Sequence, residues 1–256
     1  MTEHLDLLRT WEQTLRERGA LSDADQLRDA VLDPNLADAE SCWEVMWSKP
    51  LYANTRVDIG ERKRIAIAPQ MAGSWQFIGA DDERFVITHQ GGRNAAENFS
   101  IHGVLAHNLR TTHKIAAHRL FAIQGAAIFL RRLADRAGVN APFASVAQEP
   151  LAKVVPELRQ QLGREWGPIT VLHMLTDLGL AVKPDLHLVR TVRRLGLLPG
   201  LDEMKVPNEE IAIRINEAVA QLATDYGGSS SRAANLRYMD KLLMEVSRQG
   251  LLLEAG

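Results

Sequence analysis

Residues 163–198 combine a glycine-rich turn, a short apolar helix, a helix stop and a basic helix, and the rest of the chain is organised around this unit. Residues 163–167 predict a tight turn, and Pro168 suits a first helical position, where its missing N–H group costs nothing. Apolar residues follow at helical spacing until Gly179, which favours a helix end. A six-residue step then leads to Asp185, where a second helix is predicted to begin.

The second helix separates apolar from basic residues. Its apolar side chains share one face: Leu188, Val189, Val192 and Leu195. Arg190, Arg193 and Arg194 fall largely on the opposite side. Aspartate is favoured at the residue before a helix, because its carboxylate accepts N–H groups that the first turn leaves free. Taken alone, Asp185 is therefore interpreted as a helix cap.

Length and composition indicate an ordinary globular protein. A chain of 256 residues can bury a full-sized core, as one large domain or as two closely packed parts. It has no apolar run of about eighteen residues and no signal-peptide pattern at Met1. We therefore expect no membrane partner and a cytoplasmic, bacterial-type protein that acts at the nucleoid. The single cysteine, Cys42, excludes an internal disulfide framework and suits a reducing compartment.

The net charge of −2 is unusual for a nucleic-acid-binding protein, but the charge is unevenly distributed. Residues 1–50 hold eleven Asp and Glu against five Lys and Arg, a balance of −6, whereas residues 101–200 hold six against thirteen, a balance of +7. Basic charge is therefore concentrated where the two short helices lie, as a nucleic-acid footprint requires. Any other solvated basic face would give the same distribution.

The first part of the chain predicts three helices followed by a small β-sheet. The helices are expected over 3–18, 22–32 and 38–46, with Pro50 ending the third. Between 51 and 92 three short β-prone runs, separated by turn residues, predict the sheet: 64–68, 75–78 and 84–88.

From Ala95 the sequence is helical almost to its end. Besides the central unit, helices are expected over 99–119, 123–137, 148–162, 208–224 and 232–249, the last two joined by a linker at 226–231. The predicted fold class is therefore mostly α. We divide the chain into an N-terminal part, 1–95, with the small sheet, and a helical body, 96–256.

The central unit resembles the helix-hairpin-helix DNA glycosylase superfamily. That family carries a hairpin of the form L-P-G-[IV]-G-x-x-T, followed downstream by an aspartate in a V-D-x-H-x-x-R frame. Residues 167–170, Gly-Pro-Ile-Thr, match the second half of the hairpin. Residues 184–187, Pro-Asp-Leu-His, match the aspartate frame together with Arg190 and Arg194.

The resemblance implies a two-part helical body with the DNA cleft between its parts, and the N-terminal region as a possible pocket wall. It is close over 163–198 and extends from about residue 95 to the end, whereas residues 1–90 show no match. Glu165 stands where the family has its first hairpin glycine, a difference expected to weaken phosphate binding there. The single cysteine excludes the four-cysteine iron–sulfur loop of some members.

The resemblance also implies that Asp185 is the catalytic acid. Breaking an N-glycosidic bond develops positive charge on the sugar, which a facing carboxylate stabilises while it orients or deprotonates the attacking water. Members that also cut the DNA backbone attack the sugar with a lysine of the hairpin helix, and Ile169 occupies that position here. Base release by water alone is therefore implied. Lys183 is the one lysine near enough in sequence to act as a nucleophile instead.

Further residues are expected to contact double-stranded DNA. Gly167 and Thr170 correspond to the part of the hairpin that offers N–H groups and a hydroxyl to a phosphate. Asn108 is the candidate for a polar side chain that fills the gap left by a flipped base, with a plain surface asparagine as the alternative. The other candidates surround the aspartate and could in part be paired internally: Lys183, His187, Arg190, Arg193 and Arg194.

The predicted function is a monofunctional DNA glycosylase that flips out a base and hydrolyses its N-glycosidic bond. The alternative is a helix-hairpin-helix protein that binds DNA without chemistry. The substrate stays open between an alkylated or oxidised base and a bulky modified base such as those of phage DNA. The sequence does not predict protein partners.

We expect no cofactor and no metal. Four histidines fall on one predicted helix: His102, His107, His113 and His118. Those that share a face are eleven residues apart, which separates them by about 16 Å, too far for a single ion.

Overall fold

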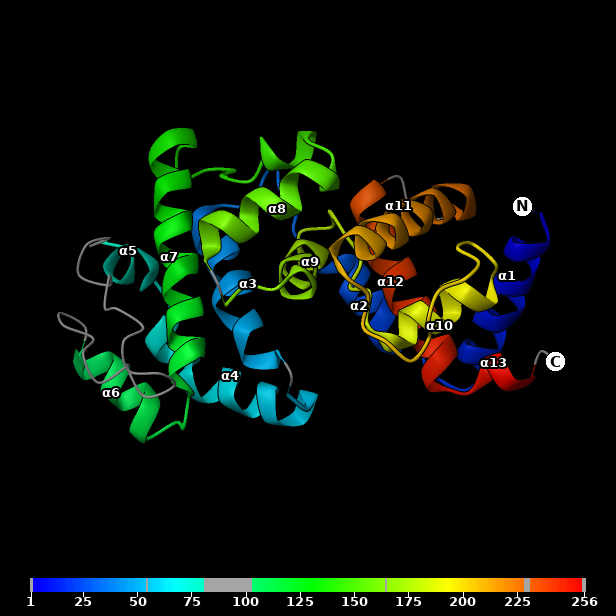
Figure 1. Cartoon of the computed structure of the whole chain (residues 1–256), viewed down its shortest axis with the longest axis horizontal. Coiled ribbons are helices and arrows are strands. Elements are labelled where there is room, and N and C mark those ends of the chain that lie inside the picture. Colours follow the sequence, from blue (N-terminus) through cyan, green and yellow to red (C-terminus); the bar gives the residue numbers. More distant parts are fainter. Residues whose placement is uncertain (1, 54, 81–102, 164, 228–230, 255–256) are drawn as a thin grey trace. The chain divides into compact units, whose positions relative to one another are not determined.

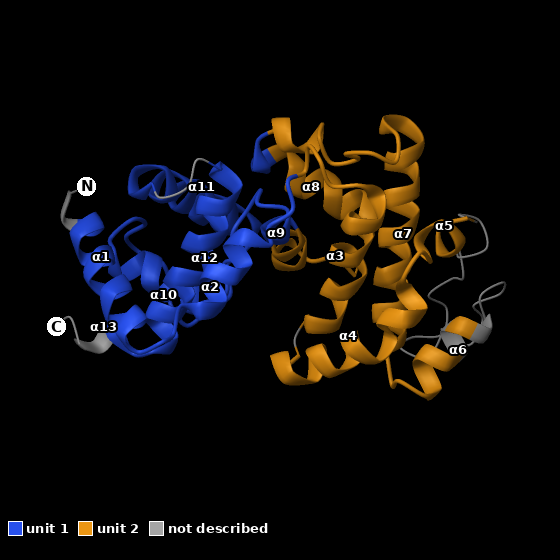
Figure 2. Ribbon diagram, turned by 180° about the vertical axis from the view of Figure 1, so that it is seen from behind, with its two compact units in different colours: residues 1–33, 150–152, 175–256 blue, residues 34–149, 153–174 orange. Residues whose placement is uncertain are grey.

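The computed structural model describes residues 2–53, 55–80, 103–163, 165–227 and 231–254. Within these ranges the regular secondary structure is helical (Figure 1), so the predicted mostly α fold is confirmed. The chain forms two compact units (Figure 2): unit 1 contains residues 1–33, 150–152 and 175–256, and unit 2 contains residues 34–149 and 153–174. No described helix is both long and apolar enough to cross a membrane.

Unit 1 is built around α12 (Arg232–Arg248). Buried residues occur on several sides of α12, as expected for a helix in the middle of a core. The helices packed against it are α1 (Thr2–Glu17), α2 (Ser22–Asp29), α10 (Leu186–Arg194), α11 (Glu209–Tyr226) and α13 (Leu251–Glu254). Leu8 and Leu15 of α1 join Leu242 and Val246 of α12 in this core, all at 0% exposure. Burying each such side chain contributes about 1.5–3 kcal/mol.

Unit 2 is centred on α3 (Ala39–Tyr52), which packs against α4 (Val57–Met71) and α7 (Ala117–Ala137). Trp43 and Trp47 are fully buried on α3, and the indole N–H group of Trp43 donates to the Met71 carbonyl at 2.6 Å. The other helices are α5 (Trp75–Ile78), α6 (Gly103–Thr111), a short 3-10 helix (Val146–Gln148), α8 (Leu151–Leu162) and α9 (Pro168–Asp177). The boundary between the units crosses α8 and α9.

The predicted small β-sheet is wrong for the two runs that the structure describes. Residues 64–68 belong to α4, and residues 75–78 form α5. In α4, Ile67 is buried and Ile65 is 59% exposed, so the alternation that predicted a strand reflects a single buried side chain on a helix. Periodicity alone does not separate strand from helix in such short runs. The third run, 84–88, lies outside the described residues.

Pro50 does not end α3, which continues to Tyr52. A proline removes one helical N–H donor, and this loss is compatible with a final turn whose carbonyls find other partners. Arg119 provides them, because its guanidinium donates to the carbonyls of Leu51 at 3.1 Å and Ala53 at 3.0 Å.

The helix predicted over 99–119 is interrupted. α6 ends at Thr111, Lys114 adopts a left-handed conformation with φ 56°, and α7 begins at Ala117 rather than at residue 123. The turn is stabilised by the buried side chain of Ile115 and by Lys63, whose Nζ donates to the Lys114 carbonyl at 2.9 Å. The other described helices, including both helices of the central unit, begin and end within a few residues of their predicted bounds.

The compact units differ from the predicted division into residues 1–95 and 96–256. Residues 1–33 belong with the C-terminal helices in unit 1. The apolar faces of α1 and α2 account for this, because they are buried in the same core as α10, α11 and α12. An amphipathic helix packs wherever a complementary apolar surface exists, regardless of its distance along the chain.

Candidate functional site

Asp185 lies at the N-terminus of α10 in an extended conformation, with φ −78° and ψ 177°. Its Oδ1 atom accepts the backbone N–H groups of His187 at 3.0 Å and Leu188 at 3.1 Å. The interpretation of Asp185 as a helix cap is therefore confirmed. Its Oδ2 atom makes no hydrogen bond with any described residue. One oxygen of this half-buried carboxylate holds the helix, and the other is available.

The turn that precedes Asp185 is held by two buried side chains. The Val182 N–H group donates to Asn216 Oδ1 at 2.6 Å, and the Lys183 N–H group donates to Asp240 Oδ1 at 2.8 Å. Asn216 on α11 is 2% exposed and Asp240 on α12 is 6% exposed. These backbone donors are thus satisfied inside the protein, as buried N–H groups must be.

Asp240 is a buried charge with a partner. Its Oδ2 atom lies 3.0 Å from Nη1 of Arg237, whose Nη2 lies 3.1 Å from a carboxylate oxygen of Asp177 at the end of α9. Burial, with a smaller contribution from the charge of Asp185, raises the pKa of Asp240 to about 6 against the lowering effects of Arg237 and the Lys183 N–H group. A charge buried in this way is stable only with its partner in place.

Side-chain contacts fix α10 on α12 next to Asp185. The Nδ1 atom of His187 lies 3.1 Å from the Ser247 hydroxyl oxygen. The Thr191 hydroxyl donates to the Leu243 carbonyl at 2.8 Å. His187, predicted to contact DNA, is therefore half-buried and engaged within unit 1.

The basic residues predicted around Asp185 have different environments. Arg193 forms an ion pair with Glu203 at 3.5 Å, so the alternative of internal pairing holds for this residue. Arg190 is half-buried and makes no ion pair with a described residue. Arg194 is exposed, and Lys183 is half-buried with its charge close enough to lower the pKa of Asp240.

The predicted hairpin residues lie at the start of α9, in the part that belongs to unit 2. The Gly167 carbonyl accepts the N–H groups of Thr170 at 3.0 Å and Val171 at 3.1 Å. A Cβ atom built on Gly167 would meet no atom within 4 Å, so the space beside it is open. The Ile169 N–H group and the Thr170 hydroxyl make no hydrogen bond with the described residues, which leaves two donors for a ligand. Trp166, at 1% exposure, belongs to the core.

Asn108 lies on α6 and is half-buried rather than a free surface residue. Its Oδ1 atom is buried and finds no hydrogen-bond partner among the described residues. A side chain that fills a gap in DNA must be accessible, so in this conformation the Asn108 carbonyl oxygen does not meet the requirement.

The predicted histidine group is only partly described. His102 and the side chain of His107 lie outside the described residues. The Nε2 atom of His113 lies 3.0 Å from the amide nitrogen of Gln70. In the part of the chain that the structure describes, no three His, Cys, Asp or Glu side chains lie where they could share a metal ion.

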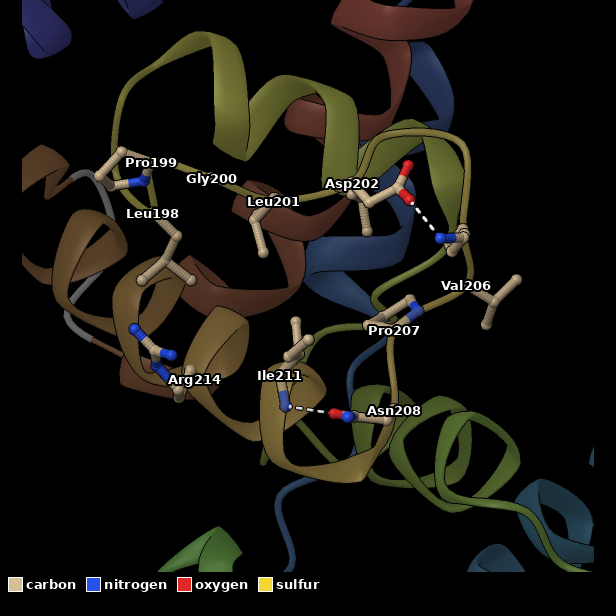
Figure 3. Close-up of a pocket in the computed structure, with 12 residues that line it drawn as sticks. Leu198, Pro199, Gly200, Leu201, Asp202, Val206, Pro207, Asn208, Ile211 and Arg214 are labelled. Atoms are coloured by element: carbon tan, nitrogen blue, oxygen red, sulfur yellow. Dashed lines mark hydrogen bonds and ion pairs between the residues drawn. The ribbon is translucent and has the colours of Figure 1, made fainter.

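A cavity of about 400 Å³ lies beside α10 in unit 1 (Figure 3), lined by Val189 and by side chains from 198–214. Leu201 and Ile211 point toward each other across it. Asp185 is not among its lining residues, so the cavity is separate from the predicted catalytic carboxylate.

Asn216, Arg237 and Asp240 are not among the residues that the sequence motifs predict. For Asn216 and Asp240 the signal is a polar residue within an otherwise apolar helical stripe, because Asn216 lies between buried Ala212 and Val219, and Asp240 lies between buried Leu236 and Leu243. Fully buried Asp and Asn are rare without a specific partner, so such positions indicate a polar contact even though the sequence does not reveal the partner.

The arrangement around Asp185 has definite chemical capacities. Among the residues that the structure describes, it presents one carboxylate oxygen without a hydrogen bond on a turn held by buried hydrogen bonds, and it has Arg190, without an ion pair, on the same helix. A carboxylate held in this way can stabilise a developing positive charge or accept a proton from water. Comparisons of the chain with family models, curated proteins and solved structures find no significant match.

Proposed function

We propose that this protein is a monofunctional DNA glycosylase, which flips a damaged or modified base out of double-stranded DNA and leaves an abasic site. The observation that carries the proposal is the carboxylate of Asp185, whose Oδ1 caps α10 while Oδ2 makes no hydrogen bond with a described residue. A free carboxylate oxygen repels the phosphates of bound DNA, so a protein that binds DNA there has a chemical reason to keep it.

In the proposed reaction, the bond between the sugar C1′ and the base nitrogen breaks, and its electron pair leaves with the base. The sugar becomes oxocarbenium-like, and the negative charge of Asp185 stabilises it. Water then adds to C1′, Asp185 accepts the proton of this water, and the departing base gains a proton from solvent. Ile169 supports the monofunctional form, because it has no amine that could form a Schiff base with the sugar.

Each unit, taken by itself, offers donors that suit a DNA phosphate. The first turn of α9 offers the Ile169 N–H group and the Thr170 hydroxyl, and helix N-termini favour phosphate. In unit 1, Lys183, Arg190 and Arg194 carry positive charge close to Asp185 in sequence. Arg193 is a weaker candidate, since Glu203 already neutralises it.

One observation favours a second function, DNA binding without chemistry. Asp185 has a complete structural role as the cap of α10, and this role alone accounts for an aspartate at that position. The cavity of Figure 3 also lies away from it, because Asp185 is not a lining residue. On this alternative the protein binds duplex DNA but releases no base from it.

The decisive experiment is base release, followed by mass spectrometry of the small-molecule fraction. Wild-type protein and Asp185→Asn are incubated with duplexes that carry alkylated, oxidised, deaminated or phage-type modified bases. Asparagine caps helices about as well as aspartate, so this variant should fold normally. We expect the wild type to release a base from one of these DNAs, and the variant to be at least about 100-fold slower while binding DNA at least as tightly as the wild type.

A matched control is Asp38→Asn, because Asp38 caps α3 through the Ser41 N–H group at 2.8 Å without belonging to the site. This variant should keep the wild-type rate. If the protein binds DNA but releases no base from any of the duplexes, the alternative function, DNA binding without chemistry, would be supported instead. If borohydride traps a covalent protein–DNA adduct and Lys183→Ala abolishes this adduct, the reaction proceeds by lyase chemistry through Lys183 and not by hydrolysis. The base that is released would also decide between repair of damage and defence against modified phage DNA.

A further inference from the structure

Lys183 connects the buried carboxylate of Asp240 to the backbone of Asp185. The Lys183 N–H group donates to Asp240 Oδ1 at 2.8 Å, and the Lys183 carbonyl accepts the Asp185 N–H group at 2.8 Å. Pro184, between the two, is buried and has a φ restricted by its ring. Two hydrogen bonds in series thus lead from α12 to the cap of α10, through a turn with little conformational freedom.

The N–H group of the preceding residue, Val182, is also held by a buried side chain. Asn216 accepts the Val182 N–H group at 2.6 Å, and its own amide nitrogen donates to the Ala212 carbonyl at 2.9 Å. The second bond fixes the orientation of the Asn216 amide. Successive N–H groups before Asp185 are therefore anchored to two different helices, α11 and α12.

At Asp240 the protein uses a carboxylate where a neutral amide could accept the same N–H group. The carboxylate costs more to bury, as its raised pKa of about 6 shows. What the charge adds is the contact with Arg237, at 3.0 Å from Oδ2. With Oδ1 on the turn and Oδ2 on Arg237, the plane of the carboxylate has one orientation. Arg237 is itself held by Asp177, at 3.1 Å.

We propose that Asp240, as an ion pair with Arg237, is a positioning residue that holds the Lys183–Asp185 turn and so keeps the Asp185 carboxylate in its reactive orientation. Its effect on catalysis rests on the proposed glycosylase function. Its effect on the turn does not, and the two can be measured separately. Asp240 does not touch the substrate, since it is buried beneath the turn.

The first measurement is amide hydrogen exchange of the full chain, which needs no activity. Asp240→Ala removes the acceptor of the Lys183 N–H group, and we expect exchange at this amide to rise at least about tenfold. Asp240→Asn keeps an oxygen that can accept the Lys183 N–H group, but it places an amide NH2 group against the guanidinium of Arg237. We therefore expect an intermediate rise in the exchange rate of the Lys183 amide. Amides of α3 in unit 2 serve as the internal reference for global stability.

The matched control is Glu245→Gln. Glu245 is also 6% exposed on α12, but it pairs with Lys241 at 3.2 Å and Arg248 at 3.1 Å and does not contact the turn. This variant loses a buried carboxylate of the same helix without touching Lys183. Its exchange at Lys183 should remain at the wild-type level.

The second measurement is single-turnover base release on the panel duplex that the wild type cleaves fastest. A small misplacement of a catalytic group costs up to about 100-fold in rate. We expect Asp240→Ala to lower the single-turnover rate constant by about 10- to 100-fold, Asp240→Asn to lie between it and the wild type, and DNA affinity to change little. Glu245→Gln should keep the wild-type single-turnover rate constant. This result would show that the loss of a buried carboxylate from α12 does not by itself lower the rate.

Protection of the Lys183 amide that survives in Asp240→Ala would overturn the proposal. So would equal base release by Asp240→Ala and Glu245→Gln. If the wild type releases no base at all, the proposed function and the catalytic part of this inference both fail. The exchange rates would still decide whether Asp240 holds the turn.

Discussion

Several single residues in this protein place charge where an apolar side chain would be cheaper to bury. Asp240 and Glu245 are each 6% exposed on α12, and each has a basic partner within 3.2 Å. Replacing such pairs by apolar residues is often neutral for stability, so stability alone does not account for a buried carboxylate at these positions. Asp240 accepts the N–H group of Lys183, two residues before Asp185, and this contact is the basis for its proposed role as a positioning residue.

The predictability of a residue's role depended on how local its partners are. The cap formed by Asp185 was predictable, because its partners His187 and Leu188 follow within three residues. The contact of Asp240 with Lys183 spans 57 residues, and no pattern in the sequence specifies it. The burial of the Asn108 Oδ1 atom likewise has no local signal in the sequence.

Cys42 provides a prediction at the residue scale. Burial, together with the charge of Asp38, raises the pKa of its thiol to about 12, and the side chain is 0% exposed. Because the thiolate is the reactive form, we expect native protein to react with Ellman's reagent at least about 100-fold more slowly than protein in denaturant. A Ser145→Cys variant, at an exposed position, is the positive control and should react quickly in the native state. Fast reaction of Cys42 itself would contradict its burial.

At the scale of elements, the signals that worked are those of helix ends and helical apolar spacing. α9 begins at Pro168 and α10 follows Asp185, as predicted from a proline, a glycine and an aspartate. The signals that failed are short apolar runs. Residues 64–68 of α4 and residues 75–78, which form α5, were predicted as strands, although α5 buries Trp75 and Ile78 at helical spacing. Which period is real depends on the surface against which a run packs, and here that surface includes α3 and α7.

The close approach of two elements at Gly179 gives a second prediction. Gly179 follows α9 with φ 63°, and a Cβ atom there would lie 2.3 Å from Ala233 Cβ and 2.9 Å from its Cα atom on α12. Gly19 follows α1 with φ 67° and open space around it. Gly19→Ala should lower the free energy of unfolding by about 1–2 kcal/mol through backbone strain alone. Gly179→Ala should cost about 1–3 kcal/mol more through overpacking.

Urea unfolding of both glycine variants measures this difference. Because the two residues share the same backbone conformation, their difference isolates the steric contact with α12. If both variants lowered the free energy of unfolding equally, α12 would move to accommodate the new Cβ atom without any loss of stability. That outcome would contradict the close packing described for Gly179 and Ala233.

At the scale of the whole molecule, unit 1 joins the two ends of the chain. Glu12 on α1 accepts hydrogen bonds from the hydroxyls of Tyr226 on α11 and Tyr238 on α12, and its Oε1 lies 2.9 Å from Nη2 of Arg16. The N-terminal helices are therefore part of the unit that carries Asp185. A division at residue 95 could not express this, because it was based on a change of local pattern along the chain.

The Glu12 contacts predict how stability depends on pH. Burial raises the pKa of Glu12, but the hydrogen bonds from Tyr226, Tyr238 and Arg16 outweigh it, and the pKa in the folded protein lies below the ordinary value of 4.5. A carboxyl with a lowered folded pKa contributes stability that is present above its unfolded pKa and is lost as pH falls through the folded one. Unfolding free energies should therefore drop on the acid side of pH 4.5.

Glu12→Gln tests this dependence. Urea unfolding from pH 6 to pH 3, a range of about three units around the ordinary carboxyl pKa, should show a shallower acid loss in the variant than in the wild type. Glu17→Gln is the control, because Glu17 is an exposed residue of the same helix whose side chain accepts a hydrogen bond from Gln13, one turn away. An acid slope reduced equally by both substitutions would contradict a specific role for Glu12.

The sequence by itself determined the features whose causes lie within a few residues. These are the mostly α class, the two helices of the central unit and the cap at Asp185, because caps, stops and apolar spacing act over single helical turns. Tertiary structure alone decided that α4 and α5 are helices, that α1 and α2 pack with the C-terminal helices, and that Asp240 and Asn216 hold the turn before Asp185. Each of these depends on which distant apolar surface or polar partner a segment meets, and that information arises only when the chain is packed.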